Sequence, residues 1–312
     1  MLLIADSPLR RIWGGQANMV QPALGLFCVL CPLHSAKCPV KGGAMPFRKA
    51  WLYVLTLLVL TFVAFWPSYL SKLPAAKMAH HFHAASAVLW TVLAIVQSWT
   101  IHHDRISLHR RTGMAIFLLF PLFLVAGVWV IHVEATTLAT GLDSATGLSD
   151  SENVELAQFG FFDPLANLGY ALMFWGGLTH RYKVHLHARY MLGTVMFVIA
   201  PIVWRLLRGY VPMIHDMPFS YPFALGNLTA IGIALFLYAQ APKHGRPFLL
   251  VAGIIAAQEV LFETLGRIPA WAPMFASVSD MNLPFLLILT GITSIGIAWH
   301  GWVVGARPGA PS

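Results

Sequence analysis

The sequence predicts an all-α fold, a polytopic membrane helix bundle with about eight transmembrane helices (seven if the weakest segment does not cross) and an internal hairpin repeat. Three observations support this prediction. Only 10% of the 312 residues are charged and 58% are hydrophobic, whereas a soluble domain carries about 25% charged residues. Long uncharged runs are suited to cross ~30 Å of hydrocarbon as helices. A polar pattern at 102–111 recurs at 180–189.

The apolar runs define the spans in chain order. The first run ends in the aromatic turn Trp-Pro-Ser-Tyr at 66–69, which is typical of a membrane interface. Pro121 and Pro201 lie inside the third and fifth runs, where a proline kinks a helix. The fourth run is the shortest, so it decides between eight spans and seven. The predicted spans are 50–69, 84–101, 112–132, 164–179, 190–207, 222–240, 247–266 and 283–304.

Positive charge gathers in alternate links. Lysine and arginine follow the second, fourth, sixth and eighth runs, and the link between the third and fourth runs contains neither. The positive-inside rule then places the histidine-rich links and both chain termini in the cytoplasm. This asymmetry accounts for the net charge of +8, so no nucleic-acid partner is needed to explain it.

Residues 1–44 differ from the rest of the chain. All three cysteines (Cys28, Cys31 and Cys38) lie there, and the apolar stretch at 20–33 is too short to span a bilayer. We interpret 1–44 as a disordered leader or as a start assigned too far upstream, followed by a single transmembrane domain at 45–312. Because no cysteine follows Cys38, the membrane domain cannot ligate an iron–sulfur cluster through thiolates.

The repeat places four histidines at the same side of the bilayer. His102 matches His180 at the ends of the second and fourth spans, and His109 matches His187 at the starts of the third and fifth. Two imidazoles on facing helices can hold a b-type haem, so we predict His109 and His187 as cofactor ligands, with His102 and His180 as a second pair. The four imidazoles could instead bind a transition metal. The alternative is that they are solvated residues of basic links.

A second polar group lies in the predicted outer half of the membrane. Charged side chains inside hydrocarbon are candidates for function, and Glu259 and Glu263 lie one turn apart on the seventh span. The candidate catalytic or proton-binding residues are Glu259, Glu263, Asp163 and Arg205. His83 and His132 lie at the edge of this layer and are candidate metal ligands. The alternative is a structural polar cluster that fixes helix packing.

Motifs within 48–208 resemble those of a family of uncharacterised bacterial multi-pass membrane proteins. They are the aromatic turn at 66–69, His-x-His at 81–83, Leu-His-Arg-Arg-x-Gly at 108–113 and His-x-Arg-Tyr-Met at 187–191. This resemblance implies the fold and the location but no activity. The motif at 108–113 is also similar to a haem-binding helix start of ascorbate-reducible b-type cytochromes. Met191 stands where the second copy would need a glycine, so this likeness implies at most one haem.

Three functions are compatible with these patterns. The first is a redox protein of the inner membrane that binds a b-type haem through the interfacial histidines. The second is a non-haem, metal-dependent membrane enzyme that acts on a lipid-like substrate. A quinone or a lipid-like small molecule is a candidate partner. The third is a proton-coupled transporter, or a non-catalytic membrane protein, that uses the outer polar layer. The lipid bilayer is the partner common to all three.

Overall fold

The computed structural model describes residues 47–143 and 150–306, and these ranges contain helices and no strand. The leader predicted at 1–44 lies outside the described residues. The described part after residue 46 belongs to one compact unit, which the next paragraphs describe.

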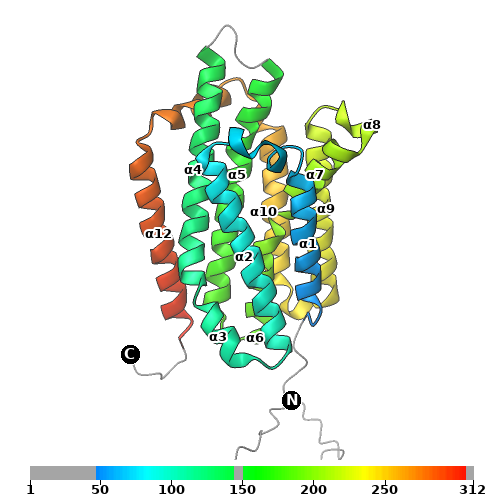
Figure 1. Ribbon diagram of the computed structural model, residues 1–312, viewed down its shortest axis with the longest axis vertical. Coiled ribbons are helices and arrows are strands. Elements are labelled where there is room, and N and C mark those ends of the chain that lie inside the picture. Colours follow the sequence, from blue (N-terminus) through cyan, green and yellow to red (C-terminus); the bar gives the residue numbers. More distant parts are fainter. Residues whose placement is uncertain (1–46, 144–149, 307–312) are drawn as a thin grey trace, which may run out of the picture. The chain divides into compact units, whose positions relative to one another are not determined.

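Eight rods of helix run up and down this unit (Figure 1). In chain order they are α1 (Ala50–Phe65), α2 (Met78–His102), α4 (Ile116–Asp143), α5 (Asp150–Thr179), α6 (Val184–Met196) continued by α7 (Ile199–Tyr210), α9 (Ser220–Gln240), α10 (Arg246–Glu263) and α12 (Leu283–Val304). Successive rods alternate in direction. We call the end that carries the links 103–105 and 180–183 the lower end, and the end where α4 stops and α5 starts the upper end, as in Figure 1.

Six of these rods are long and apolar enough to cross a membrane: α2, α4, the continuous α6–α7, α9, α10 and α12. Helix α1 is apolar but shorter, and α5 is the longest helix of the bundle. The predicted all-α polytopic bundle is therefore confirmed, and each predicted span falls on one of the eight rods. In hydrocarbon a helix satisfies its own backbone hydrogen bonds, which is why the chain adopts no other structure there.

Short helices close both ends of the bundle. The lower end carries α3 (Ile106–Gly113) and η3 (Pro242–His244). The upper end carries η2 (Leu70–Ala75), α8 (Pro212–His215), η4 (Leu265–Arg267), α11 (Trp271–Ala276) and η5 (Ser277–Asp280).

Helix α5 lies at the centre, in contact with α4, α6, α10 and α12. The Phe174 ring is buried and stacks on Phe120 of α4, with ring centroids 3.7 Å apart. On the opposite side, an added Cβ at Gly169 would overlap the ring of Phe197, which lies between α6 and α7. Gly169 therefore allows close contact between α5 and the rod formed by α6 and α7.

Helices α4 and α5 extend further up than the predicted spans. We expected the third span to end at 132 and the fourth to begin at 164, but α4 continues to Asp143 and α5 starts at Asp150. Threonines in the extension return their hydroxyls to carbonyls one turn back on the same helix, as Thr137 does to Val133. A small apolar cluster of α4, α5 and α11, built around Leu138 and Phe275, covers the extension.

The rod formed by α6 and α7 is interrupted at Phe197 and Val198. Pro201 is the cause, because it has no N–H to donate to the carbonyl of Phe197 four residues earlier. This position agrees with the kink that the sequence predicts for the fifth span.

Two buried glutamines join α5 to α10 near the upper end. The Gln158 side-chain amide donates to the carbonyl of Phe262 over 2.8 Å, and the Gln258 amide donates to the carbonyl of Phe162 over 2.8 Å. Each glutamine thus bonds to the residue that follows the other glutamine by four positions. We call this arrangement the glutamine clamp. Phe262 lies in the last turn of α10, where a helix leaves its carbonyls without partners, so Gln158 caps α10 from another helix.

Candidate functional site

Four helices bring polar side chains together in the upper half of the bundle. The residues are His83 of α2, Glu134 of α4, Asp163 of α5 and Arg205 of α7, and we call them the upper polar cluster. All four residues are half-buried. Three of their atoms, His83 Nδ1, Glu134 Oε2 and Arg205 Nε, are buried without a hydrogen-bond partner among the described residues. Unpaired buried polar atoms are costly, so they mark a place where a ligand, water or proton is accommodated.

The two carboxyl groups of the cluster interact with each other. A side-chain hydrogen bond links Glu134 to Asp163. An ionised carboxylate can only accept hydrogen bonds, so a bond between two carboxyl groups requires that one of them is protonated. Two carboxylates sharing one proton is also the arrangement that like-charge repulsion favours. Two carboxyl groups in this contact can share one proton.

Arg205 supplies the positive charge of the cluster. Its guanidinium carbon lies 4.1 Å from the centre of the Phe65 ring and 3.9 Å from that of Trp204, so it is held between two aromatic faces. It interacts electrostatically with both Glu134 and Asp163. One guanidinium and one carboxyl pair that shares a proton add to zero net charge. This neutrality lowers the free-energy cost of burying the groups.

His83 completes the cluster from α2. Its ring packs against Phe123 of α4, with centroids 5.1 Å apart, and it lies near the guanidinium of Arg205. The ring belongs to the His-x-His motif at 81–83, whose other histidine, His81, bonds through Nδ1 to the Tyr69 hydroxyl over 2.8 Å. The two histidines of the motif thus have different partners: His83 lies in the upper polar cluster, and His81 bonds to Tyr69.

The structure assigns other partners to the two glutamates of α10 that the sequence singled out. Glu259 accepts a 2.6 Å hydrogen bond from the buried amide of Asn227 on α9. Glu263 forms an ion pair of 2.7 Å with Arg267, one turn further on, as the sequence analysis expects from their spacing. Of the four predicted catalytic or proton-binding candidates, only Asp163 and Arg205 come together.

His132 was paired with His83 as a candidate metal ligand. In the structure its Nε2 lies 3.3 Å from the carbonyl of Met281, and its Nδ1 lies 3.5 Å from the Thr136 hydroxyl. Across residues 47–143 and 150–306, no group of three or more His, Cys, Asp or Glu side chains is arranged to hold a metal ion.

The lower end holds the repeated histidines. His109 Nδ1 lies 3.2 Å from the carbonyl of Gln97, and His187 Nδ1 lies 2.8 Å from the carbonyl of Gly177. Each histidine therefore anchors its helix to the preceding rod, and the two imidazoles lie near enough to interact electrostatically. Burial lowers the pKa of His109, partly opposed by its bond to Gln97.

The other repeated pair lies where α2 and α5 end. His180 Nδ1 lies 2.9 Å from the carbonyl of Gly176, and its ring stacks on Tyr190 at a centroid distance of 5.3 Å. His102 is the last residue of α2. The hairpin repeat thus extends to the anchoring of His109 and His187.

Helices α5 and α6 pack closely above His187. An added Cβ on Gly177 would overlap Met191, and one on Gly176 would lie 2.5 Å from Tyr190. Tyr190 and Met191 follow His187 by three and four residues, on the same face of α6. Their side chains fill the contact between α5 and α6 one turn beyond His187.

Glu134 is the functional residue that sequence reasoning missed. It was counted among the acidic residues of a link because the third span was expected to end at 132. A signal was present: Val130, Ala135 and Leu138 continue the apolar pattern around it, and all three are buried. A lone glutamate inside a continuing helical pattern marks an intramembrane charge.

The chain matches no protein-family model, no curated protein and no solved structure. The chemistry of the upper polar cluster therefore rests on its own geometry. It combines two interacting carboxyl groups, a guanidinium held between two aromatic rings and an imidazole, within a membrane helix bundle.

Proposed function

We propose that this multi-pass membrane protein is a proton-coupled transport protein whose coupled proton is bound by Glu134 and Asp163. The observation that carries the proposal is the hydrogen bond between these two carboxyl groups beside Arg205. Ionisable residues inside a membrane bundle that pair with one another are typical of proton relays.

Charge balance explains how proton release is coupled to a second event. When the shared proton leaves, two carboxylates face the single guanidinium of Arg205, and the cluster gains one net negative charge. An uncompensated charge in a poorly solvated site is unfavourable, so release is favoured when a cationic group arrives. Oxygen ligands from two carboxylates suit a small hard cation. The transported solute is therefore proposed to be cationic, exchanged against the proton.

The proposal includes a location. Six helices suited to cross a bilayer support a multi-pass membrane protein. We place it in a bacterial inner membrane with the lower end in the cytoplasm, because Arg105, Arg110, Arg111, Arg181 and Lys183 gather there. The motifs shared with the bacterial membrane family fit this location. The upper polar cluster then opens toward the outer side.

Infrared difference spectroscopy of the purified protein tests the shared proton directly. The wild type should show a protonated carboxyl C=O band at neutral pH, and Glu134→Gln and Asp163→Asn should each remove it. Glu263→Gln is the matched control, because that carboxylate is paired with Arg267 and should not contribute to the band. A wild-type spectrum without the band, or a band that survives both substitutions, contradicts the proposal.

Proteoliposomes test the coupling. With an imposed pH gradient and a pH-sensitive dye inside, addition of an alkali-metal cation should discharge the gradient in the wild type. The rate should fall at least tenfold in Asp163→Asn and stay unchanged in Glu263→Gln. Cation-independent proton flux, or equal rates in the three proteins, would contradict cation exchange.

A second candidate function is supported by the lower histidine pair. His109 and His187 are both anchored through Nδ1, and this arrangement directs Nε2 of each ring to a ligand. It favours a redox role with a b-type haem. His109 and His187 would hold the haem, which would supply one-electron redox chemistry, and Tyr190 and Met191 lie one turn further along α6, packed against Gly176 and Gly177.

A further inference from the structure

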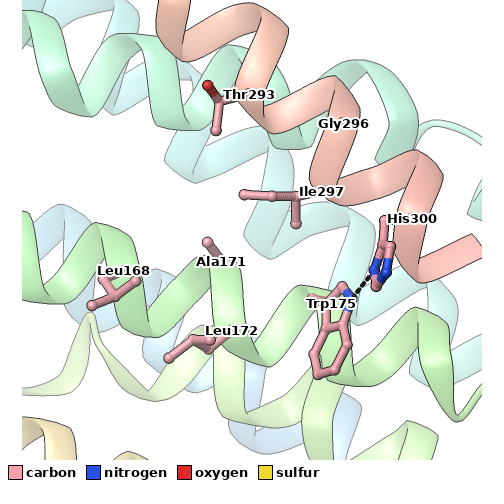
Figure 2. A pocket seen from close by; sticks show the side chains of 8 residues that line it. All are labelled: Leu168, Ala171, Leu172, Trp175, Thr293, Gly296, Ile297 and His300. Carbon is pink, nitrogen blue, oxygen red and sulfur yellow. Dashed lines mark hydrogen bonds between the residues drawn. The ribbon is translucent and has the colours of Figure 1, made fainter.

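A groove of about 450 Å³ runs along the seam between α5 and α12 (Figure 2). Helix α12 contacts the bundle through α4 and α5. The wall on α5 is formed by Leu168, Ala171 and Leu172, and the wall on α12 includes Gly296 and Ile297. An added Cβ on Gly296 would meet nothing within 4 Å, so this glycine keeps the groove open.

One polar pair closes the lower end of the groove. The Trp175 indole N–H donates to Nδ1 of His300 over 3.0 Å, and the two rings are nearly parallel at 16° (Figure 2). Because an indole N–H can only donate, Nδ1 of His300 accepts. The imidazole is therefore neutral, with its proton on Nε2. No other hydrogen bond of His300 is found within the described ranges.

The lining of the groove favours a ligand with an uncharged headgroup. None of its lining residues is lysine, arginine, aspartate or glutamate. His300 precedes the end of α12 by four residues, so its donor lies about 6 Å inside the helix end. The cation nearest in sequence, Arg181, is already bound: it donates to the carbonyl of Trp302 over 2.6 Å and lies on the Trp302 ring. An anionic phospholipid head would find no free partner in the groove itself.

We propose that the groove between α5 and α12 binds an isoprenoid quinone. The prenyl chain lies along the aliphatic walls, and a ring carbonyl accepts the hydrogen bond from His300 Nε2. The Trp175–His300 pair offers a flat aromatic surface beside the carbonyl, which suits a planar ring. This site is separate from the upper polar cluster and does not depend on the proton-coupled function.

Photolabelling of the purified full-length protein in detergent tests the proposal. The probe is an azido-benzoquinone with a decyl chain, and labelled peptides are identified by mass spectrometry. We expect labels on α5 and α12 that an excess of unlabelled decyl-benzoquinone removes. Gly296→Leu should abolish labelling by filling the groove. Gly232→Leu is the matched control, because a Cβ on Gly232 of α9 also meets nothing within 4 Å, and it should label like the wild type.

The hydrogen bond is tested separately. His300→Phe should weaken quinone binding about fivefold, the value of one ordinary hydrogen bond, and His300→Gln should restore much of it because its amide can still donate. Equal affinity in His300→Phe would overturn the donor role. Labelling that survives Gly296→Leu, or that dioleoyl phosphatidylglycerol displaces as well as decyl-benzoquinone does, would overturn the proposal and identify the groove as a general lipid contact.

Discussion

Replacing Gln158 with leucine should destabilise the bundle, because the glutamine clamp is its best-defined polar contact between two helices. Leucine keeps much of the volume, so packing changes little and the lost hydrogen bond dominates. Both clamp bonds are 2.8 Å long and join buried groups. The carbonyl of Phe262 would lose its only partner outside α10 and stay buried. Gln258→Leu removes the other clamp bond, although the carbonyl of Phe162 lies inside α5 and keeps its hydrogen bond along that helix.

The magnitude follows from measured ranges. Hydrogen bonds between membrane helices average about 0.6 kcal/mol and reach about 1.7 kcal/mol, and a buried acceptor left unpaired adds to this. Each single substitution should therefore destabilise the protein by about 1–2 kcal/mol. The two bonds hold the same two turns, so loss of one loosens the other. The double variant should cost less than the sum of the singles, by at least about 0.5 kcal/mol.

Unfolding by SDS titration in mixed micelles measures these free energies. Gln240→Leu is the control, because Gln240 is exposed at the end of α9 and should change stability by no more than about 0.5 kcal/mol. The clamp bonds Phe162, the neighbour of Asp163, so the infrared band of the shared carboxyl proton should also broaden in Gln258→Leu. The reasoning is refuted if the clamp variants are as stable as Gln240→Leu, or if the singles add fully.

Three further predictions concern helix packing, the pH dependence of stability and the visible absorption spectrum. Gly226→Ala should destabilise the protein by about 1–3 kcal/mol, because its Cβ would lie 2.7 Å from the carbonyl oxygen of Ala200. Gly253→Ala should stabilise the protein slightly, because its Cβ would lie in open space. Thermal unfolding distinguishes the two variants. Burial lowers the pKa of His109, so the unfolded chain binds more protons than the folded protein, and the free energy of unfolding should fall as pH drops below about 6.5. The slope of this free energy against pH should be smaller in His109→Gln, and equal slopes in the two proteins would contradict the prediction. A reduced-minus-oxidised visible spectrum tests the second candidate function: a b-type alpha band that is lost in His109→Ala/His187→Ala would establish the haem, and a spectrum without the band would contradict it.

The positions of the helices could be predicted from the sequence, but several of their ends could not. Uncharged runs determine which segments cross, because charge is the main penalty in hydrocarbon. Helix ends depend on what covers them. Glu134 looked like the start of a polar link, yet α4 continues to Asp143 because α11 packs against the extension through Phe275. That contact joins segments far apart in the chain and leaves no local signal.

The candidate site was predictable in part for a related reason. Asp163 and Arg205 were recognised because each interrupts an apolar run. Which acid joins them depends on helix rotation, and the structure selects Glu134 rather than Glu259, whose partner is Asn227. Rotation is set by side-chain packing between neighbouring helices. The packing of Arg205 between the rings of Phe65 and Trp204 likewise could not be predicted from the spacing of residues in the sequence.

The depth of the upper polar cluster has an electrical consequence. His83 follows the start of α2 by five residues and Arg205 precedes the end of α7 by five, which places both about 7.5 Å below their helix ends. A charge that enters to this depth crosses about one quarter of a ~30 Å hydrocarbon layer. Moving one elementary charge across the whole membrane changes its energy by about 2.3 kcal/mol per 100 mV. Moving it between the cluster and the near side therefore changes its energy by only about 0.6 kcal/mol per 100 mV. Voltage would act mainly on the remaining path toward the lower end.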